Sequence, residues 1–328
     1  MNWQQKALRV GSWVILAAVV LRLWSNGAPQ QFLSWLRQPE TISALLFLET
    51  GKVFRPPPEE PVTTTPPTEP SVVPTEPPAA LPVFSETDAA LVYVRDTSGN
   101  TADLPALLEA PLHWDLTGAT PTVLIYHTHA TESYTQTATD RYEESSDYRT
   151  LDPEHNLVSV GARLAQLLLD AGIGTIHSDT LHDYPSYDGG YDNSRQTIQD
   201  ALADHNSIQL VLDLHRDAAV DSHGNQFSTA AQVGRRESAQ ILFLVGTDHP
   251  HWQQNMALAV KLTALLERMH PGITRGIITR TYDYNQDLSP GALLVEIGAA
   301  GDTREKALVA VETLAEAIIA LSHGSKSG

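Results

Sequence analysis

The chain has 328 residues, with 39 acidic and 21 basic side chains, a formal net charge of −18 and no cysteine. This acidic balance argues against a nucleic-acid-binding protein, because such proteins present basic patches that neutralise phosphates. The absence of cysteine excludes disulfides and thiolate ligands, so any bound metal must be held by His, Asp or Glu side chains.

The first element along the chain indicates attachment to a membrane. Residues 10–24 (VGSWVILAAVVLRLW) form an apolar run that follows Lys6 and Arg9. Positive charge marks the cytoplasmic side of a span, so we expect a cytoplasmic N-terminus at 1–9 and a transmembrane anchor at 10–28. The run is short for a helix that needs about 20 apolar residues to span, and a cleaved signal peptide is the alternative. The prediction is a single-pass protein of the cell membrane with an extracytoplasmic globular domain.

Two non-globular segments follow the predicted anchor. Residues 29–54 are semi-apolar and interrupted by Pro39 and Glu40, which predicts a membrane-proximal stalk or a contact surface for a membrane partner. Residues 55–82 are rich in Pro, Thr and Glu and hold too few apolar side chains to offset the entropy of ordering. Such a linker is an extended spacer that holds the domain at 83–328 away from the membrane.

Strands alternate with helices along the globular part of the chain. Apolar runs predict strands at 122–126, 173–178, 208–214, 241–245, 277–281 and 293–297. Apolar residues at helical spacing, together with stop signals, predict helices at 156–171, 193–205, 252–269 and 303–321. This alternation predicts an α/β domain with a mostly parallel central sheet and helices on both faces.

The first strand runs directly into a cluster of possible metal ligands. Residues 122–134 read TVLIYHTHATESY, which places His127, His129 and Glu132 just after the strand. His129 and Glu132 are three apart and share a face in a helical turn. Imidazole and carboxylate are preferred ligands of catalytic zinc, and open α/β sheets build their sites at the carboxyl ends of strands. We interpret the cluster as part of a metal site, with a purely structural histidine as the alternative for a single position.

Two later strands carry further candidates. His215 follows the apolar part of LVLDLHRDA, and Glu296 lies inside the apolar run LLVEIG. A buried carboxylate without a partner costs several kcal/mol, so Glu296 requires an explanation. One is a general base whose pKa is raised by burial; the other is an ion pair with Arg216, Arg275 or Arg280.

The chemistry that these residues suggest is amide hydrolysis. His129, Glu132 and His215 would hold zinc and leave its fourth position to water, whose pKa falls towards about 7. Glu296 would accept the proton of that water and later pass it to the leaving nitrogen. A scissile carbonyl polarised by the metal completes the predicted reaction.

The globular part also resembles a known family. The resemblance spans residues 106–321 and is carried by TVLIYHTHATESY, NLVSVGARLAQLL, IHSDTLHDYPSYDGGYDNSR, LVLDLHRDA and YNQDLSPGALLVEIG. These motifs are similar to those of the stage II sporulation protein P family, membrane-anchored cell-wall hydrolases related to the zinc-dependent N-acetylmuramoyl-L-alanine amidases.

The resemblance implies that peptidoglycan is the substrate. It implies cleavage of the N-acetylmuramoyl-L-alanine amide bond, with endopeptidase action on cross-links, during septal wall degradation and engulfment in sporulation. It also implies a stage II sporulation protein D-like partner and a location in the septal or intermembrane space. The alternative is a non-catalytic wall-binding or partner-scaffolding module on an amidase fold.

The resemblance can be carried over residue by residue. It matches His129 and His215 to the histidine ligands and Glu296 to the catalytic glutamate. Related amidases have a ligand just ahead of their first helix, which makes Glu154 a rival of Glu132 for the third position. We prefer Glu132, which the sequence fixes close to His129.

The remaining candidates would support the site or bind substrate. His127 is expected to contact the metal ligands and hold them in place without binding the metal itself. Arg216 is expected to hold a carboxylate, either that of Glu296 or a substrate terminus, with a salt bridge to Asp213 or Asp217 as the alternative.

A polar, aromatic segment and a later loop are the predicted substrate-binding parts. Tyr191 and Arg195 lie in the first of these and Asn285 in the second. They are expected to line a groove and bind peptide amides; a surface turn that caps a helix at residues 192–193 is the alternative for the first segment.

Overall fold

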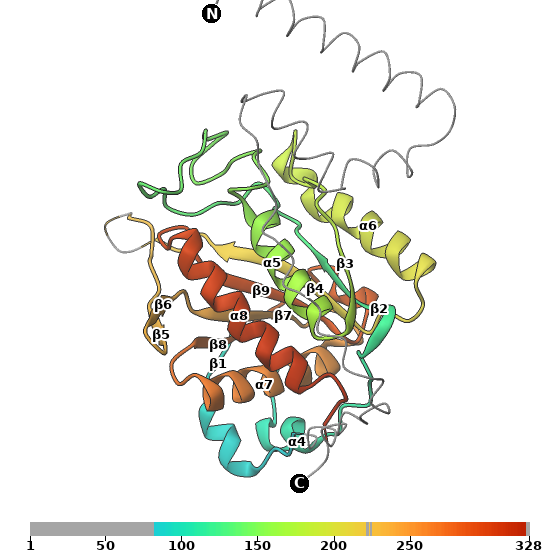
Figure 1. Ribbon diagram of the computed structural model, residues 1–328. Helices are drawn as coiled ribbons and strands as arrows, with labels where there is room; N and C mark the ends of the chain where they lie inside the picture. Colours follow the sequence, from blue (N-terminus) through green and yellow to red (C-terminus); the bar gives the residue numbers. More distant parts are fainter. Residues whose placement is uncertain (1–81, 221–222, 224, 326–328) are drawn as a thin grey trace, which may run out of the picture. The chain divides into compact units, whose positions relative to one another are not determined.

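The computed structural model describes residues 82–220, 223 and 225–325 (Figure 1). The predicted cytoplasmic end, anchor and stalk, and the linker up to residue 81, lie outside this range. Within it, no helix combines the length and apolar character that crossing a membrane requires.

A central sheet organises the described part of the chain. Its seven strands run in the order β1-β8-β7-β9-β4-β2-β3. Their bounds are β1 Val94–Asp96, β2 Gly118–Tyr126, β3 Ile173–His177, β4 Leu210–Asp217, β7 Ile241–Gly246, β8 Thr274–Arg280 and β9 Ala292–Ala299. Every neighbouring pair is parallel except β7 and β9, which are antiparallel. The prediction of a mostly parallel sheet is confirmed.

Helices cover both faces of this sheet, as predicted. The larger core includes Leu212 and Leu214 of β4 and side chains of three helices: α5 Leu157–Asp170, α7 Trp252–Met269 and α8 Arg304–Ala320. Figure 1 looks onto α5 and α8, which lie side by side over the sheet. On the opposite face, Val211 of β4 packs with Ile198 of α6 (Gly190–Asp204) in a smaller core. Alternate β4 residues therefore serve two different cores, because successive strand side chains point to opposite faces.

Local sequence signals set the ends of the helices that frame the site. Asn156 caps α5 by accepting a hydrogen bond from the backbone N–H of Val158 at 2.9 Å. Gly172 follows the helix with φ +80°, a conformation that favours glycine. Thr303 caps α8 in the same manner.

Several short elements have no counterpart in the prediction. They are the edge strand β1, the hairpin of β5 Ala231–Val233 and β6 Arg236–Ser238, the helix α4 Leu104–Glu109, and the 3-10 turns η1 Glu86–Leu91, η2 Tyr187–Gly189 and η3 Gln286–Leu288. The third predicted strand is also longer than expected. Pairing between β4 and β9 continues through His215 and Glu296, so His215 lies inside a strand rather than after it.

Candidate active site

The candidate site lies where β2, β4 and β9 end on the α6 face of the sheet. His215 and Glu296 are direct partners in the parallel register of β4 and β9. Neighbouring partners in a parallel pair point to the same face, so these two side chains lie beside each other. His129 and Glu132 approach from the turn that follows β2. The structure thus brings together four residues that lie far apart in the sequence.

His215 is enclosed by carboxylates. Its Nε2 lies 3.0 Å from Oδ2 of Asp213, and its Nδ1 lies 3.7 Å from Oε2 of Glu132. Burial lowers its pKa, but the charges of Asp213, Glu132 and Glu296 outweigh that effect and raise the pKa to about 9. Asp213 is itself fixed, because its carboxylate accepts hydrogen bonds from the backbone N–H and the hydroxyl of Thr128 at 2.8 and 2.6 Å.

His129 is the second buried imidazole. Its ring stacks on that of Tyr187, with centroids 4.3 Å apart, and stands at 85° to the ring of His215 at 5.3 Å. Its Nδ1 has no hydrogen-bond partner and lies 4.0 Å from Oδ2 of Asp183. Burial, helped by the nearby His215, lowers the pKa of His129 to about 4. The imidazole is therefore neutral at pH 7, the form that binds metals.

Glu132 is a buried carboxylate held by two arginines. Its Oε1 accepts a hydrogen bond from Arg149 at 3.1 Å, and its Oε2 accepts one from the backbone N–H of Arg216 at 3.1 Å. Burial would raise its pKa, but Arg216, His215 and Arg149 together lower it. Glu154, the rival for the third ligand position, is exposed at the surface.

Arg216 therefore has a different partner from those the sequence suggested. Its guanidinium lies 3.6 Å from Oε1 of Glu132 and donates to the carbonyl oxygens of Ser133 and Tyr148, both at 3.0 Å. Neither Glu296 nor Asp213 or Asp217 forms an ion pair with it among the described residues. The loops around residues 133 and 148, which no strand signal marks, supply the carbonyls that turn Arg216 towards Glu132.

Glu296 is half-buried, and one oxygen of its carboxylate is enclosed without compensation. Its Oε2 has no hydrogen-bond partner among the described residues. Burial raises its pKa to about 8; His215 opposes the rise, and Glu132 and Asp217 support it. Arg275, one of the ion-pair partners considered, binds Asp217 at 2.8 Å instead. A structural salt bridge therefore does not explain this carboxyl group.

The donor types of this cluster suit a zinc ion, although the side chains as placed do not form a ready ligand set. Nδ1 of His129 is buried and lacks a hydrogen-bond partner, whereas Nε2 of His215 lies 3.0 Å from Oδ2 of Asp213. One imidazole nitrogen is therefore free, and His215, whose pKa is raised to about 9, would bind a metal only after losing a proton. In the described part of the chain, however, no group of three or more His, Asp or Glu side chains is clustered closely enough to hold a metal. Glu132 would have to turn from Arg149 to become the third ligand.

The residues predicted to bind substrate mainly join two segments of the chain. Arg195 pairs with Asp287 through two contacts of 2.8 and 2.5 Å. Asn285 is buried and donates to the backbone oxygen of Tyr191 at 2.9 Å. Tyr191 lies in the first turn of α6, with its ring 5.6 Å from that of His129. Only Tyr191 of the three contacts a candidate ligand.

His127 lies on the other side of the sheet from these groups, among residues of α5. Its Nδ1 is 3.2 Å from the carbonyl oxygen of Leu214, and its Nε2 is 2.9 Å from Nε2 of His177. Burial, together with His177, lowers its pKa to about 3. With both nitrogens engaged there, His127 does not hydrogen-bond to His129 or His215.

From the sequence, neither Asp183 nor Arg149 has a role in the site. The sequence suggests Asp213 only as a salt-bridge partner of Arg216, and Tyr187 belongs to the aromatic segment expected to line a groove. Asp213 carries the same signal as Glu296, a carboxylate inside an apolar strand, and could have been found by it. Asp183 and Arg149 come from loops, where no periodic pattern marks a position.

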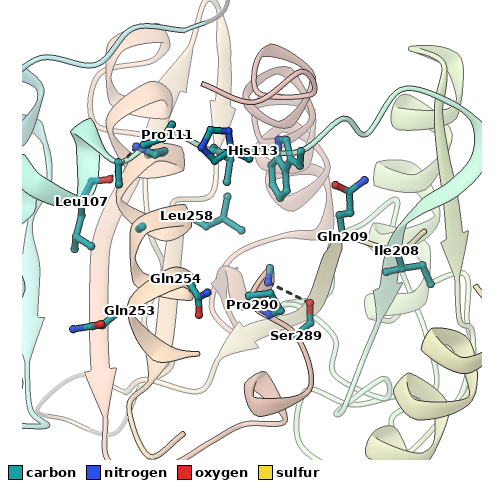
Figure 2. Close-up of a pocket in the computed structure, with 16 residues that line it drawn as sticks. Leu107, Pro111, His113, Ile208, Gln209, Gln253, Gln254, Leu258, Ser289 and Pro290 are labelled. Atoms are coloured by element: carbon teal, nitrogen blue, oxygen red, sulfur yellow. Dashed lines mark hydrogen bonds between the residues drawn. The ribbon is translucent and has the colours of Figure 1, made fainter. Parts of the chain in front are cut away.

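A separate cavity of about 530 Å³ lies at the other end of the strands (Figure 2). Gln209, just before β4, and Pro290 and Gly291, just before β9, contribute to its lining. It contains none of the histidines or carboxylates of the candidate site, so the cavity and the candidate site are distinct.

The fold and the site define the chain as an α/β protein with buried histidines and carboxylates gathered at the carboxyl ends of adjacent parallel strands. The family model described as stage II sporulation protein P matches residues 75–319, which is more than half of the chain. The chain belongs to the stage II sporulation protein P family.

A curated relative supports this assignment. Stage II sporulation protein P of Bacillus subtilis (strain 168) is 31% identical over 201 residues, covering 58% of this chain and 48% of the relative. The chain thus spans about half the length of the relative that it matches.

Solved structures give a weaker likeness. The N-acetylmuramoyl-L-alanine amidase AmiC2 of Nostoc punctiforme is 14% identical, covers 62% of this chain and 97% of its own, and has a TM-score of 0.37. The CwlD amidase from Clostridioides difficile, solved with the GerS lipoprotein, is 15% identical, with coverages of 60% and 94% and a TM-score of 0.37. At these values the likeness carries no argument about the activity of this chain.

Proposed function

We propose that this protein is a zinc-dependent peptidoglycan hydrolase that cleaves the amide bond between N-acetylmuramic acid and L-alanine. The observation that carries the proposal is Glu296, a half-buried residue in register with His215, whose Oε2 is enclosed and has no hydrogen-bond partner among the described residues. With its pKa raised to about 8, this group exchanges its proton near neutral pH: its ionised fraction can accept a proton and its acid form can return one, as a general base requires.

Each residue of the site has a separate role in the proposed reaction. His129, His215 and Glu132 would hold the zinc ion, which when bound would polarise the scissile carbonyl and acidify a water. Glu296 takes the proton from the attacking water and returns it to the departing amide nitrogen. Asp213, fixed by two hydrogen bonds from Thr128, sets the orientation of the His215 ring.

The proposal extends to where the reaction takes place. Family membership and the N-terminal sequence support a membrane-anchored enzyme that acts on septal peptidoglycan during sporulation and engulfment. A stage II sporulation protein D-like partner and endopeptidase action on cross-links belong to the same proposal.

The test is digestion of isolated wall sacculi by the full-length chain. The isosteric variant Glu296→Gln should lose stem-peptide release while retaining its zinc content. Glu154→Gln, an exposed glutamate altered in the same way, is the matched control and should keep full activity. Hydrolysis at the normal rate by Glu296→Gln would remove Glu296 from the assigned role.

Zinc content and product identity separate the alternatives. Zinc stoichiometry should fall in Glu132→Ala and His215→Ala but not in Glu154→Ala. If the wild-type chain binds sacculi but releases no stem peptide, with or without chelator, the domain is a wall-binding module rather than an enzyme. Release of free amino acids instead would indicate a carboxypeptidase.

A further inference from the structure

A row of tyrosine rings leads from His129 to the surface. The ring of Tyr191 lies 5.6 Å from that of His129, and the rings of Tyr284 and Tyr282 lie 5.9 and 6.0 Å from that of Tyr191. Tyr282 and Tyr284 are 4.8 Å apart. We propose that Tyr282 and Tyr284 form a stacking platform for a sugar ring of the glycan strand, a subsite that rests on the proposed action on peptidoglycan.

Tyr282 has the ring that is free to receive a ligand. It is 50% exposed, and its ring contacts are perpendicular ones with Tyr191 and Tyr284. Tyr187, which is also exposed, is already used: its ring stacks on His129 and lies 4.8 Å from the guanidinium of Arg149. Tyr282, at the surface end of the row, is therefore available to a ligand, whereas Tyr187 is occupied by its contacts with His129 and Arg149.

The backbone holds this platform in place before any ligand arrives. A Cβ atom on Gly246 would lie 2.2 Å from the backbone oxygen of Tyr282, so the segment rests directly on β7. The buried Gln286 accepts from the N–H of Gly246 at 2.9 Å and donates to the oxygen of Leu244 at 2.8 Å.

Two consecutive residues of the same segment adopt a costly conformation. Tyr284 and Asn285 have φ values of +51° and +58°. Non-glycine residues in the left-handed region persist only where their surroundings fix them, and such strain gathers at binding sites. A platform ordered in advance avoids the entropy cost of ordering on binding.

The chemistry of the tyrosine ring favours a sugar as the occupant. Charge does not decide between sugar and peptide: Arg195 is neutralised by Asp287 at 2.5 Å, but the exposed Arg280 lies close enough to Tyr284 to oppose the rise in its pKa. An N-acetylglucosamine ring is neutral and presents a face of C–H groups, which suits the electron-rich face of a tyrosine ring.

The experiment measures binding of a peptide-free sugar by the full-length chain, without hydrolysis. The probe is chitotetraose, titrated by calorimetry in a zwitterionic detergent that contains no sugar. Tyr282→Ala should weaken binding on the order of tenfold, since loss of about 1.4 kcal/mol corresponds to that factor. Tyr282→Phe keeps the ring and should bind as the wild type does.

Two controls make the result specific. Tyr93→Ala removes a tyrosine that is 65% exposed beside β1, away from the row, and should leave the dissociation constant unchanged. The tripeptide L-Ala-D-Glu-diaminopimelate, titrated in parallel, should bind wild type and Tyr282→Ala alike. Thermal midpoints of the variants report whether each remains folded.

The outcomes are distinguishable from those of the proposed reaction. Absence of chitotetraose binding by the wild-type chain, or equal binding by Tyr282→Ala, overturns the platform. A loss confined to the tripeptide would assign the row to the peptide instead and also overturns it. Because no bond is cleaved, an active Glu296→Gln variant would refute the proposed base while leaving this measurement valid.

Discussion

Asp302 offers the sharpest test of the packing that supports β9, the strand that carries Glu296. Its side chain is fully buried, and each of its oxygens accepts two hydrogen bonds. Oδ1 accepts from the hydroxyl of Ser228 and the backbone N–H of Thr229, both at 2.9 Å. Oδ2 accepts from the hydroxyl of Thr229 at 2.7 Å and the backbone N–H of Ala299 at 2.9 Å.

Replacement by asparagine, which preserves the shape, should still be damaging. Whichever way the amide is turned, its NH₂ group faces one backbone N–H, that of Thr229 or that of Ala299. Hydrogen bonds to a charged group contribute about 1.5–3 kcal/mol, and an unpaired buried N–H costs about 1–3 kcal/mol. We therefore expect Asp302→Asn to lower the free energy of unfolding by about 2–4 kcal/mol.

Urea unfolding of the full-length chain, followed by circular dichroism, measures this effect. The matched control is Asp170→Asn, an exposed carboxylate that accepts one hydrogen bond from Gln166 at 2.7 Å and should change stability by less than about 0.5 kcal/mol. If Asp302→Asn is as stable as this control, the inference that its NH₂ group faces a backbone N–H is wrong.

Two further predictions concern other buried positions. In Gly161→Ala, the new Cβ would lie 2.5 Å from Nε2 of His127 and 2.6 Å from Nε2 of His177. Overpacking of about 1–3 kcal/mol should exceed the gain in helix propensity of about 1 kcal/mol, and the thermal midpoint should fall. Gly189→Ala, whose Cβ meets only Asn193 at 3.5 Å, should not lower it. Burial lowers the pKa of Lys261 to about 8 from its ordinary 10.5, so the unfolded chain holds the proton more tightly. The free energy of unfolding should rise by about 1–2 kcal/mol between about pH 7.5 and about pH 9.5, and urea titrations of Lys261→Met should lack this rise.

The helices and central strands could be predicted because their signals are local. The helix at 252–269 has the same bounds in the structure, since Pro271 and Gly272 follow it and stop it. The edge strand β1 is only three residues long and pairs with β8, far along the chain, so nothing in its own sequence marks it. The antiparallel direction of β7 is equally hidden, because an apolar buried strand has the same composition in either direction.

The candidate site could be predicted in part for the same reason. His215 and Glu296 stand out as polar residues on apolar strands, and the parallel register then makes them neighbours. The partners of Glu132 could not be foreseen, because Arg149 comes from a loop and the direction of the Arg216 side chain depends on carbonyls from other loops. Contacts fixed by loop geometry leave no periodic trace in a sequence.

The position of Arg149 explains how Glu132 could change partners. The guanidinium donates to Glu132 with Nη2, but its Nη1 donates separately to Asp183 at 2.7 Å and to the hydroxyl of Thr131 at 3.1 Å. If Glu132 turned towards His129 and His215, Arg149 would keep a carboxylate partner and would not become an uncompensated buried charge, the costly outcome of breaking such a pair. The same turn would remove one negative charge from the arginines and place it between two imidazoles, where a divalent cation would compensate it. Asp183 thus compensates Arg149 in the proposed ligand exchange, although it contacts neither Glu132 nor Glu296. Arg216 would keep its hydrogen bonds to the carbonyl oxygens of Ser133 and Tyr148.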